Sequence, residues 1–386
     1  MGKIIYVTTI SMTLDYFLKG VMTDLAGAGH EVVAVSSPGE WMDNVRALEG
    51  VRVVEVPMER RIAPLSDLKS LFRLVKVFRS ERPDLVHSMT PKAGLLAMMA
   101  ARIAGVKARV HTFTGLVFPT SAGLKRRLLM ATDSITCSCA TDIIAEGEGV
   151  RRDLLDARVT RKEVKVLGHG NVRGIDLSYY DRTPEVMELA ETLKVPGVFT
   201  FLFVGRAVRD KGLEELVRAF RELCLTHSAI RLVLVGPFED DVDPVSGETR
   251  DYIQDSPDII TTGELSGKEL LAWYAAADCF VLPSYREGFP NTVLEAGAMG
   301  LPSIVTDING SREIIKEGIN GMIVPPRDSE ALHDAMEIAL RDRESLASMA
   351  AASRGEIASR FEQGYVRRCL YDFYNNFCNF AFPPSR

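Results

Sequence analysis

Two glutamates, Glu287 and Glu295, stand eight positions apart in the stretch SYREGFPNTVLEAG at 284–297. Carboxylates placed directly on a diphosphate would repel it, but carboxylates to either side can accept hydrogen bonds from sugar hydroxyls. Glu287 precedes an expected helix and can reach a sugar beyond the phosphates, whereas Glu295 lies in its second turn and can reach a ribose. The plainer interpretation is a pair of exposed acids at a helix end, where carboxylates are mildly favourable.

The segment between the two acids can bind an anion. Pro290 suits the first turn of a helix, so we expect the helix to begin there. Its early N–H groups, around Asn291, Thr292 and Val293, lack intrahelical partners and combine with the helix dipole. Gly288 lets the backbone approach a ligand closely. A diphosphate flanked by two sugars is a nucleotide-sugar, which this stretch predicts as the ligand.

A second phosphate contact is predicted in VGRAVRDKG at 204–212. Arg206 follows an apolar strand, and Lys211 comes just before a helix. Arginine offers a planar fork to phosphate oxygens, and lysine a compact point charge. Taken alone, the two cations are ordinary solvated charges at a strand–helix turn; together with the anion site at 288–293 they predict a diphosphate grip.

Several other functions are disfavoured. The segment TTISMTLDYF after the first strand contains no glycine, and no P-loop occurs, so the usual dinucleotide and NTPase motifs are missing. None of the six cysteines has CxxC spacing, so their pattern does not predict a zinc site. The net charge of −6 gives no overall attraction to nucleic acid. The acidic run Asp240–Asp243 is interpreted as a solvated loop.

Short apolar runs alternate with helical periods, which predicts an α/β fold with two doubly wound, Rossmann-like domains. A length of 386 residues agrees with two domains. We expect the first domain at 1–175 and the second at 176–365, with a C-terminal helix at about 366–386 packing back on the first. Expected strands lie at 3–9, 31–37, 51–57, 84–88, 108–114 and 134–138, and at 198–206, 230–236, 258–263, 278–283, 302–307 and 321–325.

Four stretches of the chain resemble a known family. EGFPNTVLEA is similar to the E-x7-E motif of retaining glycosyltransferases of family 4, which have the two-domain GT-B fold with a cleft between the domains. VGRAVRDKGLEELVRAF resembles the stretch that opens that family's second domain. PSIVTDINGSREIIKEGINGMIVPPRD resembles its following segment, and HGNVRGIDLSYY its interdomain turn. The resemblance covers essentially the whole chain and is strongest over 198–328; it includes the bacterial polysaccharide and lipid-linked saccharide enzymes.

The resemblance implies a role for each residue of the predicted site. Arg206 and Lys211 bind the donor diphosphate, Glu287 the transferred sugar and Glu295 the ribose. The backbone of Phe289–Val293 supports the phosphates, and the base lies near Leu265. The donor set is therefore Arg206, Lys211, Leu265, Glu287, Gly288, Phe289, Pro290, Asn291, Thr292, Val293 and Glu295. No metal and no cofactor are expected, since the cations and the helix start offset the leaving group's charge.

The implied activity is retaining transfer of a hexose or N-acetylhexosamine from a UDP-sugar to a polyprenyl-diphosphate-linked saccharide, in cell-surface polysaccharide biosynthesis. Two alternatives remain open at this point. A nucleotide-sugar epimerase or hydrolase on the same scaffold would use a similar diphosphate grip. A non-catalytic nucleotide-sugar-binding protein is disfavoured by the intact set of two cations and two carboxylates.

One position departs from the family pattern. Many relatives have a histidine before a glycine at the end of a first-domain strand, whereas VHTFTGLVF here has Thr114 before Gly115. Either Thr114 supplies a weaker hydrogen bond to the sugar, or the backbone at this position suffices. His111 lies three residues earlier and, in a strand, points to the opposite face. The sequence leaves the roles of His87, His111 and His169 open.

The acceptor and a membrane are expected on the first domain. The helix start at Lys92 and the cluster of Lys125, Arg126 and Arg127 are the candidate acceptor contacts. Basic residues beside apolar ones, in this cluster and in the helix at 66–81, suit an anionic lipid surface, although a normal solvated helix face explains either one alone. The N-terminus is interpreted as a strand and no membrane span is expected. The predicted location is cytoplasmic, with peripheral contact on the inner face of the cytoplasmic membrane.

Overall fold

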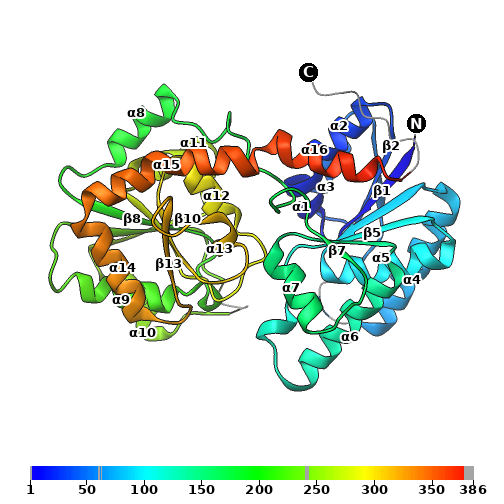
Figure 1. Cartoon of the computed structure of the whole chain (residues 1–386), viewed down its shortest axis with the longest axis horizontal. Helices are drawn as coiled ribbons and strands as arrows, with labels where there is room; N and C mark the ends of the chain where they lie inside the picture. Colours follow the sequence, from blue (N-terminus) through cyan, green and yellow to red (C-terminus); the bar gives the residue numbers. More distant parts are fainter. Residues whose placement is uncertain (1, 60, 62, 240–242, 378–386) are drawn as a thin grey trace. The chain divides into compact units, whose positions relative to one another are not determined.

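The computed structural model describes residues 2–59, 61, 63–239 and 243–377. The chain forms two compact units, one of Met1–Gly174 with Gly364–Arg386 and one of Ile175–Gln363 (Figure 1). The chain passes from one unit to the other twice, at residues 174–175 and 363–364. These two segments are hydrogen-bonded to each other, because the N–H of Ile175 donates to the carbonyl of Phe361 and the N–H of Gln363 donates to the carbonyl of Ile175. Residues 240–242 and 378–386, in the predicted acidic loop and C-terminal helix, lie outside the described residues.

The first unit contains a seven-stranded parallel sheet in the order β3-β2-β1-β4-β5-β6-β7. Its strands are β1 (Lys3–Val7), β2 (Glu31–Ser36), β3 (Val51–Glu55), β4 (Leu85–Met89), β5 (Ala108–Phe113), β6 (Asp142–Ala145) and β7 (Val164–Lys165). Along β1, Ile4 and Tyr6 face one apolar core while Ile5 and Val7 face another. The sheet is therefore covered on both faces, as the near-continuous apolar strands predict.

The helices divide between these two faces. The core around Ile5 is closed by α4 (Pro64–Glu81), α5 (Pro91–Ala104), α6 (Gly123–Cys139) and α7 (Glu148–Asp156). The core around Ile4 is closed by the π-helix η1 (Leu14–Leu18), α2 (Lys19–Gly27), α3 (Met42–Arg46) and α16 (Gln363–Tyr374). The three-residue helix α1 (Ser11–Thr13) leads into η1, and η2 (Phe118–Thr120) precedes α6.

The predicted strand at 134–138 is wrong. Its β-branched residues Ile135 and Thr136 belong to α6, in which Asp133, Thr136 and Cys137 are buried. Residues three and four apart share a helix face, so this burial continues the helical pattern that begins at Gly123. Local β-propensity was overridden by that amphipathic pattern, and the sequence analysis missed the true strands β6 and β7.

Helix α16 is fixed to the first unit by a buried hydrogen-bonded chain. The Tyr374 hydroxyl lies 2.8 Å from the Tyr6 hydroxyl and 2.5 Å from Nδ1 of His87, whose Nε2 lies 2.6 Å from Oγ1 of Thr112. Burial, together with the neighbouring His111 ring, lowers the pKa of His87 to about 3. The imidazole is therefore neutral at physiological pH, and it joins the sheet to the C-terminal helix.

The second unit contains a six-stranded parallel sheet in the order β10-β9-β8-β11-β12-β13. Its strands are β8 (Phe199–Val204), β9 (Ile230–Val235), β10 (Ile259–Gly263), β11 (Cys279–Leu282), β12 (Ser303–Thr306) and β13 (Gly321–Val324). One continuous core joins them to the surrounding helices α8 (Pro184–Leu193), α9 (Leu213–Leu223), α10 (Gly247–Asp255), α11 (Gly267–Ala276), α12 (Asn291–Ala298), α13 (Ser311–Ile314), α14 (Ser329–Arg341) and α15 (Arg343–Phe361). The prediction of two doubly wound Rossmann-like sheets is confirmed.

Each sheet has one point at which the strand order reverses. In the first unit it lies between β1 and β4, and in the second between β8 and β11. We refer to these two places as the β1/β4 and β8/β11 switch points. Ligands of open α/β sheets bind outside the carboxyl ends of the strands at such points. Within the described residues, no helix combines the length and the apolar character needed to cross a bilayer.

Candidate functional site

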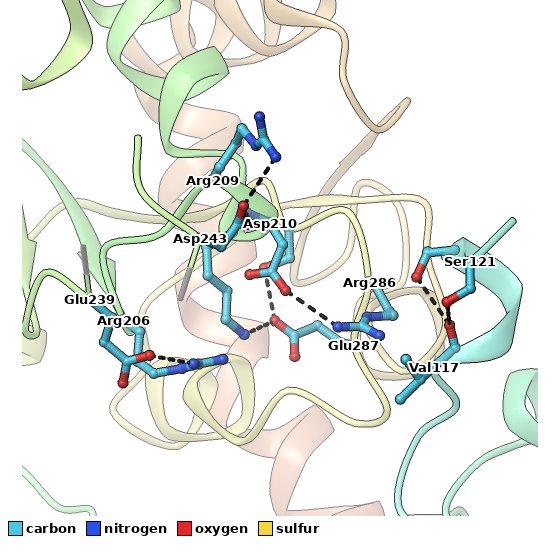
Figure 2. A network of polar contacts seen from close by, with 12 residues as sticks. Val117, Ser121, Arg206, Arg209, Asp210, Glu239, Asp243, Arg286 and Glu287 are labelled. Carbon is cyan, nitrogen blue, oxygen red and sulfur yellow. Dashed lines mark hydrogen bonds and ion pairs between the residues drawn. The ribbon is translucent and has the colours of Figure 1, made fainter. Parts of the chain in front are cut away.

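The predicted phosphate-binding cations lie in the loop that follows β8. The Arg206 guanidinium is half exposed and pairs with Glu239 at 2.7 Å, on the loop after β9. Lys211 ends the 3₁₀ turn η3 (Arg209–Lys211), whose shape is held by the N–H of Asp210 donating to Asp243 at 2.8 Å. Figure 2 shows these contacts from close by. Both cations therefore stand at the point where the strand order of this sheet reverses.

Lys211 meets one of the two glutamates that framed the predicted site. Its ammonium group forms an ion pair with Oε1 of Glu287, and the side chains are only 18% and 14% exposed. The Ser284 hydroxyl donates to the same oxygen at 2.8 Å. A cation and a carboxylate from opposite sides of the β8/β11 switch point are thus brought together in a half-buried place, where charges interact more strongly than in open water.

The loops after β8 and β11 are tied together by their backbones. The N–H of Tyr285 donates to the carbonyl of Asp210 at 2.8 Å, and the Asp210 carboxylate pairs with Arg286 at 3.4 Å (Figure 2). Gly212 has a φ of +71°, and a Cβ atom there would lie 2.0 Å from the carbonyl oxygen of Pro283. Only glycine permits this approach, which places Lys211 against Glu287.

The predicted helix after β11 exists, but it begins one residue later than expected. Pro290 is the N-cap with extended backbone (φ −73°, ψ 103°), and α12 begins at Asn291. The loop before α12 lies close against Gly310, the N-cap of α13, because a Cβ on Gly310 would lie 2.6 Å from the Gly288 carbonyl oxygen and 2.7 Å from Cα of Phe289. Phe289 is buried against Phe361, with ring centroids 5.4 Å apart. The first turn of α12 therefore has a rigid base.

Glu295 has different surroundings from Glu287. Its side chain is almost fully buried, and its two carboxylate oxygens accept hydrogen bonds from Tyr180 at 2.7 Å and Tyr274 at 3.0 Å. Tyrosine hydroxyls partly compensate the cost of burying this carboxylate. In this structure Glu295 joins α12 to α11 and to the segment after the chain crossing at Ile175. Its predicted ribose contact stays a prediction.

The remaining donor-site residues follow the carboxyl edge of the same sheet. Leu265 lies just after β10 and packs on the core. The N–H of Gly236, after β9, donates to the carbonyl of Gly263 at 2.8 Å, which links the ends of these two strands. Thr292 is partly exposed in the first turn of α12, whereas Val293 is buried. The predicted donor-site residues therefore follow the carboxyl ends of β10, β8 and β11 in this sheet.

The predicted residues of the first unit do not form a single cluster. Thr114 is half-buried just after β5, and His111 is buried within it. Burial lowers the pKa of His111 to about 3, and its Nδ1 lies 2.8 Å from the Ser88 hydroxyl. Its ring fills the space beside Gly94, where a Cβ would come within 2.3 Å. The ring of His111 therefore packs against α5. The ring of His169 lies elsewhere, near Tyr365, with ring centroids 5.9 Å apart.

The candidate acceptor cations occupy two helix starts. Lys92, in the first turn of α5, pairs with Asp67 at 2.7 Å, and both side chains are largely buried. Lys125, Arg126 and Arg127 are exposed at the start of α6. Arg126 lies 5.9 Å from the centroid of the Phe118 ring.

Sequence reasoning missed three groups that support the candidate site. Ser284 holds Glu287, and Tyr180 and Tyr274 hold Glu295. Ser284 stood within the stretch that defined the site, so its position directly after a strand was an available signal. Tyr180 contacts a residue 115 positions away, and no local pattern indicates such a pair. Among the described residues, no group of three or more His, Cys, Asp or Glu side chains could hold a metal ion.

Two protein-family models together match most of the chain. A model described as "Glycosyl transferases group 1" matches residues 188–356, which fall in the second unit. A model described as "Glycosyl transferase 4-like domain" matches residues 17–170, which fall in the first. The matched ranges include the loops after β8 and β11.

Three curated relatives agree with these matches. A capsular polysaccharide biosynthesis glycosyltransferase, CapM of Staphylococcus aureus, is 28% identical over 97% of both chains. A UDP-Gal:alpha-D-GlcNAc-diphosphoundecaprenol alpha-1,3-galactosyltransferase of Escherichia coli is 27% identical over 81% of both. A GDP-mannose-dependent alpha-mannosyltransferase of Mycolicibacterium smegmatis is 30% identical over 79% of this chain and 78% of its own.

Solved structures share the fold. A sucrose-phosphate synthase from Thermosynechococcus elongatus superposes with a TM-score of 0.80 at 19% identity, over 97% of this chain and 98% of its own. HepE of Anabaena, solved in complex with UDP, superposes with a TM-score of 0.76 at 17% identity, over 97% and 100%. These likenesses confirm the predicted GT-B fold.

Proposed function

Because the chain belongs to the group 1, family 4-like glycosyltransferases, whose members are retaining enzymes, we propose that it moves a hexose or N-acetylhexosamine from a UDP-sugar to a polyprenyl-diphosphate-linked saccharide in polysaccharide biosynthesis. The unit around 1–175 would bind the acceptor and the unit around 176–365 the donor. The E. coli relative acts, by its name, on a diphosphoundecaprenol acceptor with UDP-Gal. HepE, which shares the fold, was solved with UDP bound.

The observation that carries the proposal is the Lys211–Glu287 pair at the β8/β11 switch point. A donor diphosphate seated at the start of α12 would meet Lys211 and Arg206, and their charge would stabilise the negative charge that develops on the leaving diphosphate. Glu287 would then be free to accept hydrogen bonds from the transferred sugar. The departing phosphate oxygen would take the proton of the acceptor hydroxyl. Glu287 acts here as a positioning group for the donor.

The other donor residues would extend this arrangement along the sheet edge. The first-turn N–H groups of α12 would face the phosphates, and the partly exposed Thr292 would lie beside them. Leu265 would contact the base. Glu295 would reach the ribose only if the hydroxyls of Tyr180 and Tyr274 share its carboxylate with the ligand, because both already donate to it.

A donor screen tests the proposed function. Calorimetric titration with UDP-glucose, UDP-galactose, UDP-N-acetylglucosamine and GDP-mannose should show binding of a UDP-sugar, followed by transfer to a lipid-linked acceptor. GDP-mannose is included because one relative depends on it. Incubation with the donor alone should give neither an epimer nor free sugar at catalytic rates. Preferential binding of GDP-mannose would overturn the proposed donor class.

We also propose that the first unit binds peripherally to the inner face of the cytoplasmic membrane. Helices α4 and α6 carry six of the large exposed apolar side chains, namely Leu65, Leu68, Phe72, Leu124, Leu128 and Ile135. They also carry Lys69, Arg73, Lys76, Arg79, Lys125, Arg126 and Arg127, none of which has an ion-pair partner among the described residues. Unpaired cations beside apolar side chains match an anionic lipid surface.

Reversing two of these charges should release the protein from lipid. We expect Arg126→Glu/Arg127→Glu to weaken binding to phosphatidylglycerol-containing vesicles at least about 30-fold, since each basic residue contributes about 1 kcal/mol near such a surface. Co-sedimentation measures the change. Arg218→Glu, an exposed cation on α9 of the other unit, is the matched control and should bind as the unmodified protein does. Equal binding of the double variant would contradict the membrane proposal.

A further inference from the structure

A pocket of about 510 Å³ opens in the first unit at the reversal point between β1 and β4. Its walls come from the segment after β1, the start of α5 and the middle of α6. This is the position at which open α/β sheets bind ligands. The pocket lies entirely within one unit, so its geometry does not depend on the other.

Two threonines of the pocket lining, Thr9 and Thr90, are hydrogen-bonded to each other. The Thr9 and Thr90 hydroxyls lie 2.8 Å apart, and the Thr9 oxygen also accepts the N–H of Ala93 at 3.2 Å. Thr90 has a φ of +71°, a conformation that a β-branched residue adopts only when its surroundings hold it. Such outliers concentrate at ligand-binding sites. Because these two hydroxyls are engaged with each other, they offer a ligand little further hydrogen bonding, and the four leucines of the lining favour an apolar ligand.

Two helices each contribute a pair of leucines to the pocket wall, and in both a lysine stands three residues before the pair. Helix α5 has Lys92-Ala-Gly-Leu95-Leu96 and α6 has Lys125-Arg-Arg-Leu128-Leu129, so each reads K-x-x-L-L near its start. Residues three and four apart share one face of a helix. In both helices, therefore, a lysine stands one turn before a pair of leucines that line the pocket. The repeated arrangement gives an apolar wall with a cation at its end.

Only one of the two lysines is available to a ligand. Lys92 is neutralised by Asp67 at 2.7 Å. Lys125 is exposed and has no acidic partner among the described residues. Leu128, one turn further along α6, lines the pocket although it is 46% exposed, which places it at the pocket mouth. The free charge and the apolar mouth thus lie on neighbouring turns of one helix.

We propose that this pocket binds the part of an amphiphilic acceptor where an apolar prenyl chain joins its diphosphate. The first isoprene units lie among Leu95, Leu96, Leu128 and Leu129, and the diphosphate lies against Lys125. The assignment of a prenyl diphosphate rests on the proposed function. The match to an apolar chain rests on the leucines of the pocket, and the match to an anionic head rests on the exposed Lys125 one turn before Leu128. The pocket would then select the acceptor by its lipid rather than by its sugar.

Calorimetric titration of the whole chain with farnesyl diphosphate, below its micelle-forming concentration and without donor, tests the proposal. Farnesyl diphosphate should bind at least about tenfold more tightly than either farnesol or inorganic diphosphate. Equal affinity of farnesol would overturn the role of the charged head. Equal affinity of diphosphate would overturn the role of the apolar chain, and absence of farnesyl diphosphate binding would overturn the whole proposal.

Two variants with matched controls locate the binding. Leu128→Asn should weaken farnesyl diphosphate binding about tenfold, whereas Ile135→Asn, on the same helix with 43% exposure and outside the pocket, should not. Lys125→Gln should weaken it several-fold, whereas Lys69→Gln on α4 should not. Unchanged binding by Leu128→Asn would overturn the proposed location.

Titration of the unmodified protein with UDP-sugars, beside the titration with farnesyl diphosphate, separates this proposal from the proposed function. Farnesyl diphosphate binding without any UDP-sugar binding by the unmodified protein would remove the proposed donor and leave the pocket assignment standing. The opposite pattern would leave the donor site standing and remove the pocket assignment.

Discussion

Replacement of Lys211 with alanine is expected to lower kcat/KM for sugar transfer by about 10²- to 10³-fold. The Lys211 ammonium is the cation that pairs with Glu287 at the β8/β11 switch point. In the proposed complex it would face the leaving diphosphate, where a preorganised positive charge acts as the bond to the sugar breaks. The variant also leaves Glu287, 14% exposed, with the Ser284 hydroxyl and without its cation. Donor affinity should fall as well, which titration with UDP measures.

A neighbouring residue provides the control for this variant. Arg209 lies on the same 3₁₀ turn, but its guanidinium is 60% exposed and pairs with Asp243 at 3.2 Å. Arg209→Ala should therefore leave kcat/KM within about twofold, since exposed ion pairs contribute little. A Lys211→Ala protein that kept full activity and full UDP affinity would show that the phosphate grip lies elsewhere.

A double variant asks whether Lys211 and Glu287 act as a unit. Glu287→Gln removes the carboxylate charge but keeps its shape, and it should also lower kcat/KM. If both groups serve one donor complex, the loss in Lys211→Ala/Glu287→Gln will be smaller than the product of the two single losses. Fully multiplicative losses would indicate that Lys211 and Glu287 act independently of each other in the donor complex.

Most of the second unit could be predicted from local sequence. Its six strands lie within one or two residues of their expected ends, because each is a short apolar run bounded by turn residues. The helix start after β11 was misplaced by only one residue, since Pro290 fits either the N-cap or the first turn. Local composition also indicated Arg206, Lys211 and Glu287 as strand-end residues of one sheet.

The partners of the site residues could not be predicted in the same way. Glu295 was expected to face a ligand, yet its carboxylate lies among Tyr180 and Tyr274, which come from distant segments. Arg206 was expected to contact the donor diphosphate, and its ion pair with Glu239 after the neighbouring strand was not predicted. Such pairs depend on strand order and on the exact approach of two loops, and neither is encoded in a single periodic segment. The strand mistakenly placed at 134–138 shows the related limit, in which a longer helical pattern overrides local β-propensity.

Gly212→Ala is expected to lower the free energy of unfolding of the second unit by about 2–5 kcal/mol. The substitution combines two costs. A non-glycine residue at a φ of +71° costs about 1–2 kcal/mol, and the new methyl group would lie 2.0 Å from the Pro283 carbonyl oxygen. Because that neighbour is backbone, the loops after β8 and β11 must separate, at a further cost of about 1–3 kcal/mol.

The chain allows this effect to be measured in one unit alone. It has two tryptophans, Trp41 in the first unit and Trp273, buried in the core of the second. In a Trp41→Phe background, the fluorescence of Trp273 during urea unfolding reports on the second unit. This separation is needed because a chain with two units need not unfold in a single transition.

Gly197→Ala isolates the contribution of the close contact. Gly197 also belongs to the second unit and has a φ of +79°, but a Cβ there would meet nothing within 4 Å. It should therefore show only the backbone cost of about 1–2 kcal/mol. The difference between the two variants measures the contact between Gly212 and Pro283, and equal losses would mean that the loops are not pressed together. Since this contact holds Lys211 against Glu287, Gly212→Ala should also lose donor affinity under conditions where it remains folded, whereas Gly197→Ala should keep it.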